Sequence, residues 1–170
     1  MLTRNWRDTP NGVELEFWFA SGDGPLCAIV QGQESVFFLP RTDTDKALAL
    51  IAGVGHVEVR PVELRDFGMQ PVAALYFQRH RDARRAADLL REQGLEPLES
   101  DINPAERYLM ERFVRGSAEL HGVARPRGKY HLLENPAIKS GSYQPALRVV
   151  SFDIETAMEG LQLYSIAVHS

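Results

Sequence analysis

The hydrophobic period of this chain changes near Thr42, and this change limits the chain to folds that combine a sheet with helices. From Val13 to Phe19 apolar residues occupy every second position, which is typical of a strand with one buried face. Turn-forming residues at 10–12, 21–24 and 31–33 separate this strand from three others. We therefore expect a four-stranded meander over the first forty residues, curled into a small barrel or a curved sheet.

Beyond Thr42 the sequence predicts a strand-helix-strand-helix portion. The first helix beyond Thr42 is capped by Asp43 or Thr44 and ends near Gly53 or Gly55. Its apolar stripe includes Ala47 and Ile51. Strands are then expected at 56–62, 71–77 and 95–99, and a helix at 81–93.

A further helix has the best-specified start in the chain. Asn103 can cap it, Pro104 suits the first helical position, and Glu106 three residues after the cap completes a capping box. Leu109, Met110 and Phe113 are expected to bury one side of this helix.

Composition divides the chain into three parts. Residues 1–130 hold the meander and the helices, and residues 131–146 form a connector inside a stretch rich in glycine, proline and polar residues. Residues 147–170 begin a new hairpin, with strands from Leu147 and from Leu161 on either side of a turn. The predicted fold class is α+β.

Two carboxylates stand near the end of the strand that begins at Leu147. Side chains alternate between the faces of a strand, so Asp153 and Glu155 project together while Phe152 and Ile154 are expected to enter a core. Paired carboxylates can hold a divalent metal ion. The alternative is an ordinary solvated strand end.

Two segments are locally basic although the formal net charge is -4. Either segment can track a phosphate backbone, and Tyr130 and Tyr143 in the second can stack on bases. The alternative, which the sequence alone favours, is a solvated helix face for the first and a polar loop for the second. Their basic residues are Arg79, Arg81, Arg84, Arg85 and Arg91, and Arg125, Arg127, Lys129, Lys139 and Arg148.

Other residue types point to a reducing compartment. Cys27 is the only cysteine and is expected to be a small buried hydrophobe. No apolar run has the length of a membrane span or a signal peptide, so a cytoplasmic location is predicted. Trp6 and Trp18 are expected in the core or on a sheet face. The histidines lack metal-ligand spacing and are expected on the surface or in loops: His56, His80, His121, His131 and His169.

Four stretches, in order along the chain, resemble bacterial DNA polymerase II, a branch of the family-B DNA polymerases. They are Leu2–Pro10, Gln33–Val36, Pro104–Phe113 and Val150–Thr156. These stretches follow the family's order over nearly the whole chain. Together they are stronger evidence for the resemblance than the last motif alone, because an isolated Asp-x-Glu is common.

The resemblance implies a fold and an activity. Residues 1–130 would be the polymerase's N-terminal domain, and residues 147–170 the first strands of its RNase H-like 3′-5′ proofreading exonuclease. Asp153 and Glu155 would bind Mg²⁺, and Glu155 would help to position the attacking water. We expect the remaining acidic motifs and a tyrosine to lie beyond Ser170, so the 170-residue chain alone should neither degrade nor synthesise DNA.

The resemblance also implies partners. These are DNA, as single-stranded template and primer 3′ end, the remainder of the polymerase chain, and a sliding clamp engaged through parts outside this chain, with no membrane. The parent enzyme would act in DNA replication, repair and translesion synthesis, near the nucleoid. The alternative is a free-standing module that binds single-stranded nucleic acid or another protein.

Overall fold

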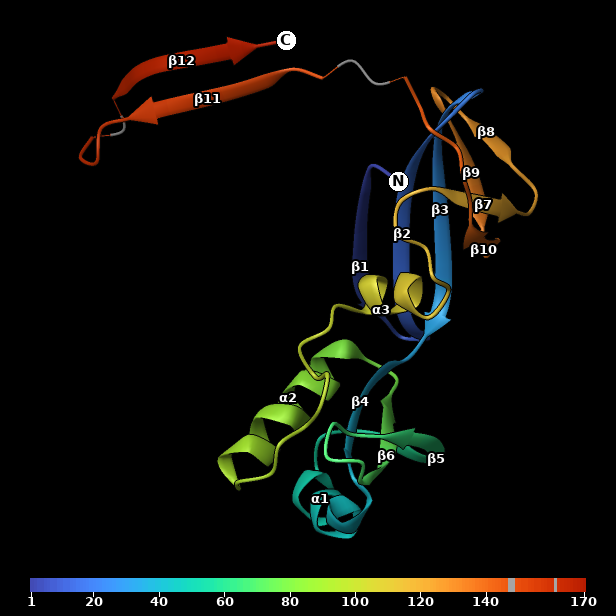
Figure 1. Ribbon diagram of the computed structural model, residues 1–170, viewed down its shortest axis with the longest axis vertical. Coiled ribbons are helices and arrows are strands. Elements are labelled where there is room, and N and C mark those ends of the chain that lie inside the picture. Colours follow the sequence, from blue (N-terminus) through green and yellow to red (C-terminus); the bar gives the residue numbers. More distant parts are fainter. Residues whose placement is uncertain (147–148, 161) are drawn as a thin grey trace.

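The computed structural model describes residues 1–146, 149–160 and 162–170 (Figure 1). It confirms the α+β class, because two main sheets are accompanied by a few short helices. An N-terminal sheet lies above a second, smaller sheet with its helices, and a long hairpin projects away from both (Figure 1).

The N-terminal sheet contains the expected meander in an open, curved form. Its strand order is β1-β2-β3-β9-β8, with ends at two different strands, so the described residues form no closed barrel. The first three strands pair antiparallel, and β9 then pairs parallel with β3. The strands are β1 (Thr3–Thr9), β2 (Gly12–Ser21), β3 (Gly24–Gln33), β8 (Arg125–Arg127) and β9 (Tyr130–Glu134).

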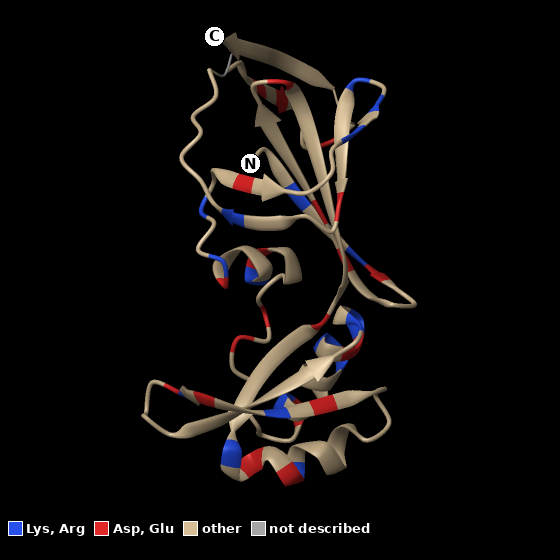
Figure 2. Ribbon diagram, turned by 90° about the vertical axis from the view of Figure 1, so that its right-hand side faces the viewer, with Lys and Arg blue, Asp and Glu red and all other residues tan. Residues whose placement is uncertain are grey.

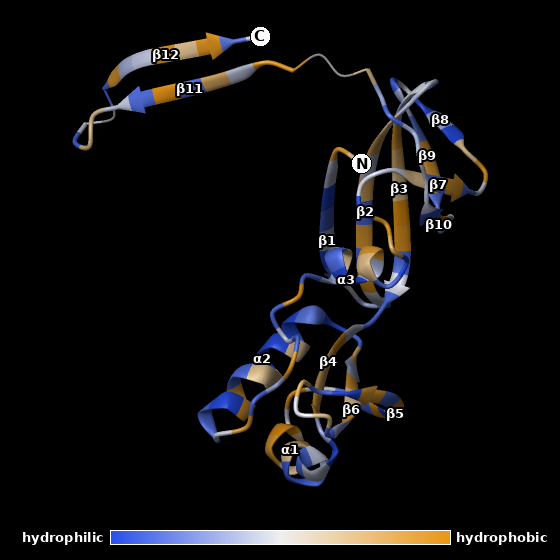
Figure 3. Ribbon diagram, viewed as in Figure 1, coloured by the Kyte–Doolittle hydropathy of each residue, from blue (hydrophilic) through white to orange (hydrophobic). Residues whose placement is uncertain are grey.

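The alternating residues of β2 build the core of this sheet. Val13, Leu15 and Phe17 have no exposed surface, and they pack under helix α3 (Pro104–Met110), whose Tyr108 ring lies 5.7 Å from that of Phe17. Figure 3 shows this apolar strip as orange bands along β2 and β3. The period-two pattern thus selected the buried face correctly.

The fourth expected strand leaves the meander. Strand β4 (Ser35–Pro40) enters a second sheet of order β4-β6-β5. Residues 31–33 continue β3, so the turn predicted there is absent. Strands β5 (Val57–Arg65) and β6 (Pro71–Phe77) complete this sheet. The expected strand at 95–99 is reduced to one bridge between Phe38 and Leu98.

Two helices cover one face of the second sheet. They are α1 (Thr44–Ile51), preceded by the short 3-10 helix η1 (Arg41–Asp43), and α2 (His80–Glu92). Their apolar residues meet Phe37, Leu75 and Phe77 in a separate buried cluster. Each sheet therefore has its own core.

Helix α3 begins as predicted but buries less than expected. Asn103 accepts a hydrogen bond from the Ala105 amide at 2.9 Å, which confirms the cap. Glu106 does not close a capping box, because its carboxylate instead pairs with Arg4 of β1. Met110 and Phe113 are 57% and 81% exposed, since the helix ends at Met110; their predicted burial was wrong.

The region from 115 to 146 holds short strands, as expected. Strands β7 (Ala118–His121) and β10 (Ala137–Ser140) pair with each other. Strand β9 lies partly inside the predicted connector but belongs to the N-terminal sheet.

The C-terminal hairpin consists of β11 (Ser151–Thr156) and β12 (Leu163–His169), joined by a turn near the predicted Glu159–Gly160. Phe152 and Ile154 are 68% and 50% exposed, so the prediction that they enter a core was wrong. No other described element covers their face. The predicted strand starts at Leu147 and Leu161, and Arg148 of the second basic segment, lie outside the described residues.

In the part of the chain that the structure describes, no helix has the length and apolar character needed to cross a membrane.

Candidate functional site

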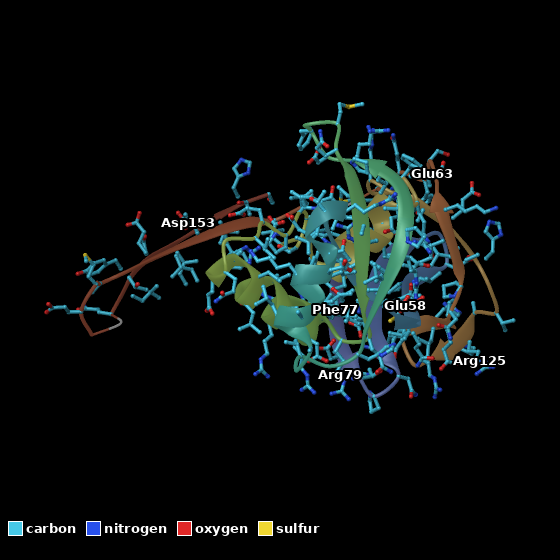
Figure 4. The ribbon with its side chains drawn as sticks, turned by 90° about the horizontal axis from the view of Figure 1, so that it is seen from below. Glu58, Glu63, Phe77, Arg79, Arg125 and Asp153 are labelled. Carbon is cyan, nitrogen blue, oxygen red and sulfur yellow. The ribbon has the colours of Figure 1, made fainter. Side chains whose placement is uncertain are left out.

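Asp153 and Glu155 lie on one face of β11, as the strand period predicted. The register places Asp153 opposite Ala167 and Glu155 opposite Ser165, so small side chains adjoin both carboxylates. Asp153 accepts a hydrogen bond from the Ile154 amide at 3.0 Å through Oδ1. Both carboxylates are exposed, and Figure 4 shows Asp153 far from the labelled residues of the two sheets.

This carboxylate pair does not by itself make a magnesium site. Among the described residues, no group of three or more histidine, cysteine, aspartate or glutamate side chains is arranged to hold a metal ion. Mg²⁺ requires a near-octahedral oxygen shell, and two exposed carboxylates provide too few ligands. The donor chemistry fits a metal, but the ligand set is incomplete, and we derive no metal-dependent step from these residues alone.

The second basic segment is partly neutralised by its neighbours. Arg125 on β8 donates to Glu134 on β9 at 3.1 Å, and Lys139 on β10 faces Glu119 on β7 in the strand register. The Tyr130 ring packs edge-on against the Trp18 ring, with 4.9 Å between the ring centroids. Tyr130 therefore already has an aromatic partner within the protein. This segment is therefore a poorer phosphate surface than its sequence suggests.

The first basic segment forms one side of α2. Within the described residues, Arg79, Arg84 and Arg85 have no salt bridge, whereas Arg91 pairs with Asp88 at 3.0 Å. Ala83, Ala86, Ala87 and Leu90 fill the buried side of the helix. The expected solvated helix face is present, and most of its positive charge lies in the first half of the helix.

A polar junction joins the two sheets at the start of α2. Asp8 of β1 accepts hydrogen bonds from the His80 and Arg81 amides at 2.7 and 3.1 Å, which caps the helix. The His80 ring lies 2.9 Å from the Ser35 hydroxyl through Nδ1, and 4.5 Å from the Trp6 ring. Trp6 is thus a sheet-face aromatic, as predicted.

His80 contradicts the prediction that the histidines lie on the surface or in loops, because it is only 6% exposed. Burial lowers the pKa of its imidazole, with a smaller opposing effect from Asp8 and a further lowering by Arg84. No local sequence signal predicts this junction, since Asp8 and His80 are 72 positions apart. Only the pairing of β4 with β6 brings Ser35 close to this helix end.

A groove of about 500 Å³ on the second sheet was also missed by the sequence analysis. Its apolar lining includes Phe38, Val62, Tyr76 and Leu98, which come from four separate segments. The Arg60 guanidinium lies 4.0 Å from the centre of the Tyr76 ring. The Arg60 charge is engaged by hydrogen bonds to Glu58 and Glu34.

Cys27 lies in the buried part of β3, as predicted. Burial, with a smaller effect of Glu16, raises the pKa of its thiol to about 11. A thiol that stays protonated at neutral pH is a weak nucleophile. Cys27 therefore acts as a small core residue.

Two family descriptions match consecutive parts of this chain. Residues 1–34 match "DNA polymerase II, N-terminal", and residues 35–95 match "DNA polymerase II, insertion domain". The division between them falls between β3 and β4, where the chain leaves the first sheet for the second. The second sheet with α1 and α2 thus corresponds to the insertion domain.

Individual relatives agree with these matches. The chain is 38% identical to DNA polymerase II of Escherichia coli K12 over 99% of its own length and 21% of that protein's. It is 28% identical to the DNA polymerase catalytic subunit of human cytomegalovirus, strain AD169, over 86% of its own length and 14% of the viral protein's. The chain therefore spans about a fifth of the length of its bacterial relative, and it belongs to the DNA polymerase II family, of which it carries the N-terminal and insertion domains.

Proposed function

We propose that this chain is the N-terminal part of a DNA-directed DNA polymerase that also has 3′-5′ proofreading exonuclease activity and acts in DNA replication, repair and translesion synthesis. The observation that carries this proposal is the 38% identity to a DNA polymerase II along 99% of the chain. Similarity that extends through both sheets and the C-terminal hairpin is far more specific than any single motif.

In this proposal Asp153 and Glu155 are the first two carboxylates of the exonuclease site. Their shared face on β11 and the small residues opposite them leave both carboxylates open to a ligand. In the complete enzyme they would supply two oxygen ligands to Mg²⁺, with the others coming from elsewhere in the polymerase. When bound, such metal ions activate water and stabilise the leaving oxygen in phosphodiester hydrolysis.

The 170-residue chain has a supporting role in this proposal. Its two sheets hold template DNA and pack against the remainder of the polymerase, and the chain alone neither synthesises nor degrades DNA. The exposed apolar side of β11 and β12 is consistent with packing against further polymerase segments. DNA, those segments and a sliding clamp bound elsewhere on the enzyme are the proposed partners, and the cytoplasm is the proposed location.

The test uses the whole protein that contains this chain, with the double variant D153A/E155A. Magnesium-dependent removal of 3′ nucleotides from a labelled primer should fall roughly a hundredfold, because the metal loses two ligands. Primer extension by the same preparation should be unchanged. The control is Asp101→Ala, an exposed acid on the loop before α3, which should alter neither activity.

Two outcomes would contradict the proposal. Wild-type protein that extends no primer is not a DNA polymerase. A double variant that degrades 3′ ends at the wild-type rate has its exonuclease site elsewhere. The isolated chain gives a separate check, since any magnesium-dependent nuclease activity that Asp153→Ala abolishes would show that two carboxylates suffice.

A further inference from the structure

We propose that the first half of α2 in the insertion domain binds the phosphate backbone of DNA through Arg79, Arg81, Arg84 and Arg85, which we call the arginine face. This inference deepens the proposed function and rests on it, because it names the surface that would hold DNA. Figure 4 shows Arg79 beside the main body of the molecule, whereas Asp153 lies out on the projecting hairpin.

The geometry of α2 presents the arginine face to solvent. Arg81, Arg84 and Arg85 are spaced three and four residues apart, so they are neighbours on one side of the helix, and all three are exposed. The opposite side is filled by alanines and Leu90 against the second sheet. The helix is thus fixed by its core side, which holds the arginines on a rigid support.

The charges on this face are poorly compensated. Between residues 79 and 87 there are four arginines and one acid, Asp82. Asp82 lies 3.8 Å from Arg81. The nearby Asp8 uses both carboxylate oxygens to accept hydrogen bonds from α2 amides. Figure 2 shows this basic stretch in blue near the region where the two sheets meet.

The clustering of arginines in the first half of α2 destabilises the helix, so helix stability does not explain it. Arg81 and Arg85 are like charges four residues apart, which costs an isolated helix about 0.2 to 0.5 kcal/mol. In the second half of the same helix, Arg91 has Asp88 as its partner. In the first half of the helix, by contrast, one acid accompanies three arginines.

A concave surface lies at the start of the arginine face. A pocket of about 220 Å³ is lined by Asp8, Thr9 and Pro10 of the β1–β2 region and by Arg79 and Arg81. Gln78 donates a hydrogen bond to the Pro10 carbonyl at 3.1 Å beside it. A bound strand would therefore contact both the N-terminal sheet and the insertion domain.

The residue type suits a phosphate backbone. Every cation between 79 and 91 is an arginine, whose planar guanidinium binds phosphate oxygens through two parallel hydrogen bonds and can stack on bases. The second basic segment lacks this arrangement, since Glu134 engages Arg125 and Trp18 covers one side of Tyr130. An acidic protein segment is the competing ligand and is one outcome of the test.

The experiment measures binding of the 170-residue chain to fluorescein-labelled oligothymidine by anisotropy across a range of salt concentrations, with a duplex of equal length as the second probe. In R84A/R85A, affinity should fall roughly tenfold at low salt, and the slope of log K against log salt should decrease by about 1.4 in magnitude for the single strand. R84K/R85K, which keeps the charge, should retain most of the binding.

The matched control is R91A/R125A. It removes the same charge, but from arginines that are already engaged by Asp88 and Glu134, and it should bind like the wild type. Circular dichroism melting of each variant identifies any loss of folding. The comparison of the two probes tells whether single strand or duplex is preferred.

Three results would overturn the inference. These are no binding of either DNA by the wild-type chain, equal losses in the test and control variants, and displacement of DNA by polyglutamate at matched charge, which would indicate an acidic protein partner. None of them bears on primer extension by the whole protein. Failure of the arginine face is therefore distinguishable from failure of the proposed polymerase function.

Discussion

The sheet of the insertion domain and the C-terminal hairpin both carry large apolar side chains on their strands, but the surroundings of these side chains are opposite. In β4 and β6 the apolar positions are buried by α1 and α2, so Phe37 and Phe77 stack at 5.2 Å and are each 1% exposed. In β11 the large apolar residues are Phe152 and Ile154, which are 68% and 50% exposed. Alternation therefore defines which residues share a face, whereas another layer decides whether that face is buried.

The largest effect is expected when one phenylalanine is replaced in each region. Phe77→Ala should lower the free energy of unfolding by about 3 to 5 kcal/mol, because it leaves a cavity in a closed core. Phe152→Ala should change it by less than about 0.5 kcal/mol. Urea unfolding followed by circular dichroism measures both. Equal losses would mean that the hairpin face is covered in solution.

A pH dependence tests the junction that connects the covered sheet to the N-terminal sheet. The His80 ring faces the Ser35 hydroxyl, the Trp6 ring, Asp8 and Arg84, and burial lowers its pKa from the usual value of about 6.5. The unfolded chain takes up a proton as the pH falls through about 6.5, while the folded chain does so only at lower pH. Its contribution to stability is therefore complete above that pH and is lost below it.

His80→Gln is the matched variant, since its side chain keeps a hydrogen-bonding group near Ser35 but does not titrate. Between pH of about 7 and 5, wild type should lose more stability than this variant. Urea unfolding at a series of pH values gives the difference. Identical pH profiles would show that His80 has the same pKa in the folded and unfolded chain.

The smallest expected effect comes from removing residues 147–170. The hairpin strands pair with each other and with no other described strand, so the free energy of unfolding of the remainder should change by less than about 0.5 kcal/mol. Self-association should decrease, because an exposed apolar face and free strand edges favour contacts between molecules. Unfolding curves and sedimentation velocity of both chains test these two expectations.

Much of the fold was predictable because its signals are local. The spacing in β2 identified Val13, Leu15 and Phe17 as buried, and Asn103 with Pro104 marked the start of α3. Predictions failed where a distant residue competed with a local preference. Glu106 pairs with Arg4, which is 102 positions away, instead of closing a capping box.

The candidate site divides in the same way. The shared face of Asp153 and Glu155 followed from the strand period and was confirmed by the register. Their roles as metal ligands and the role of Mg²⁺ stay predictions. The groove beside Tyr76 and the junction at His80 could not be predicted, because each is assembled from segments far apart in the sequence.

The sequence by itself determined the α+β class, most of the elements, the face that carries the two carboxylates, and the resemblance to DNA polymerase II. Only the tertiary structure decided that β4 joins a second sheet, that Arg84 and Arg85 have no salt bridge among the described residues while Arg125 has one, and that no described element covers the hairpin. The physical reason is the sequence separation over which each interaction acts. Backbone period and capping act over a few residues, whereas burial and charge compensation depend on which distant segments come together.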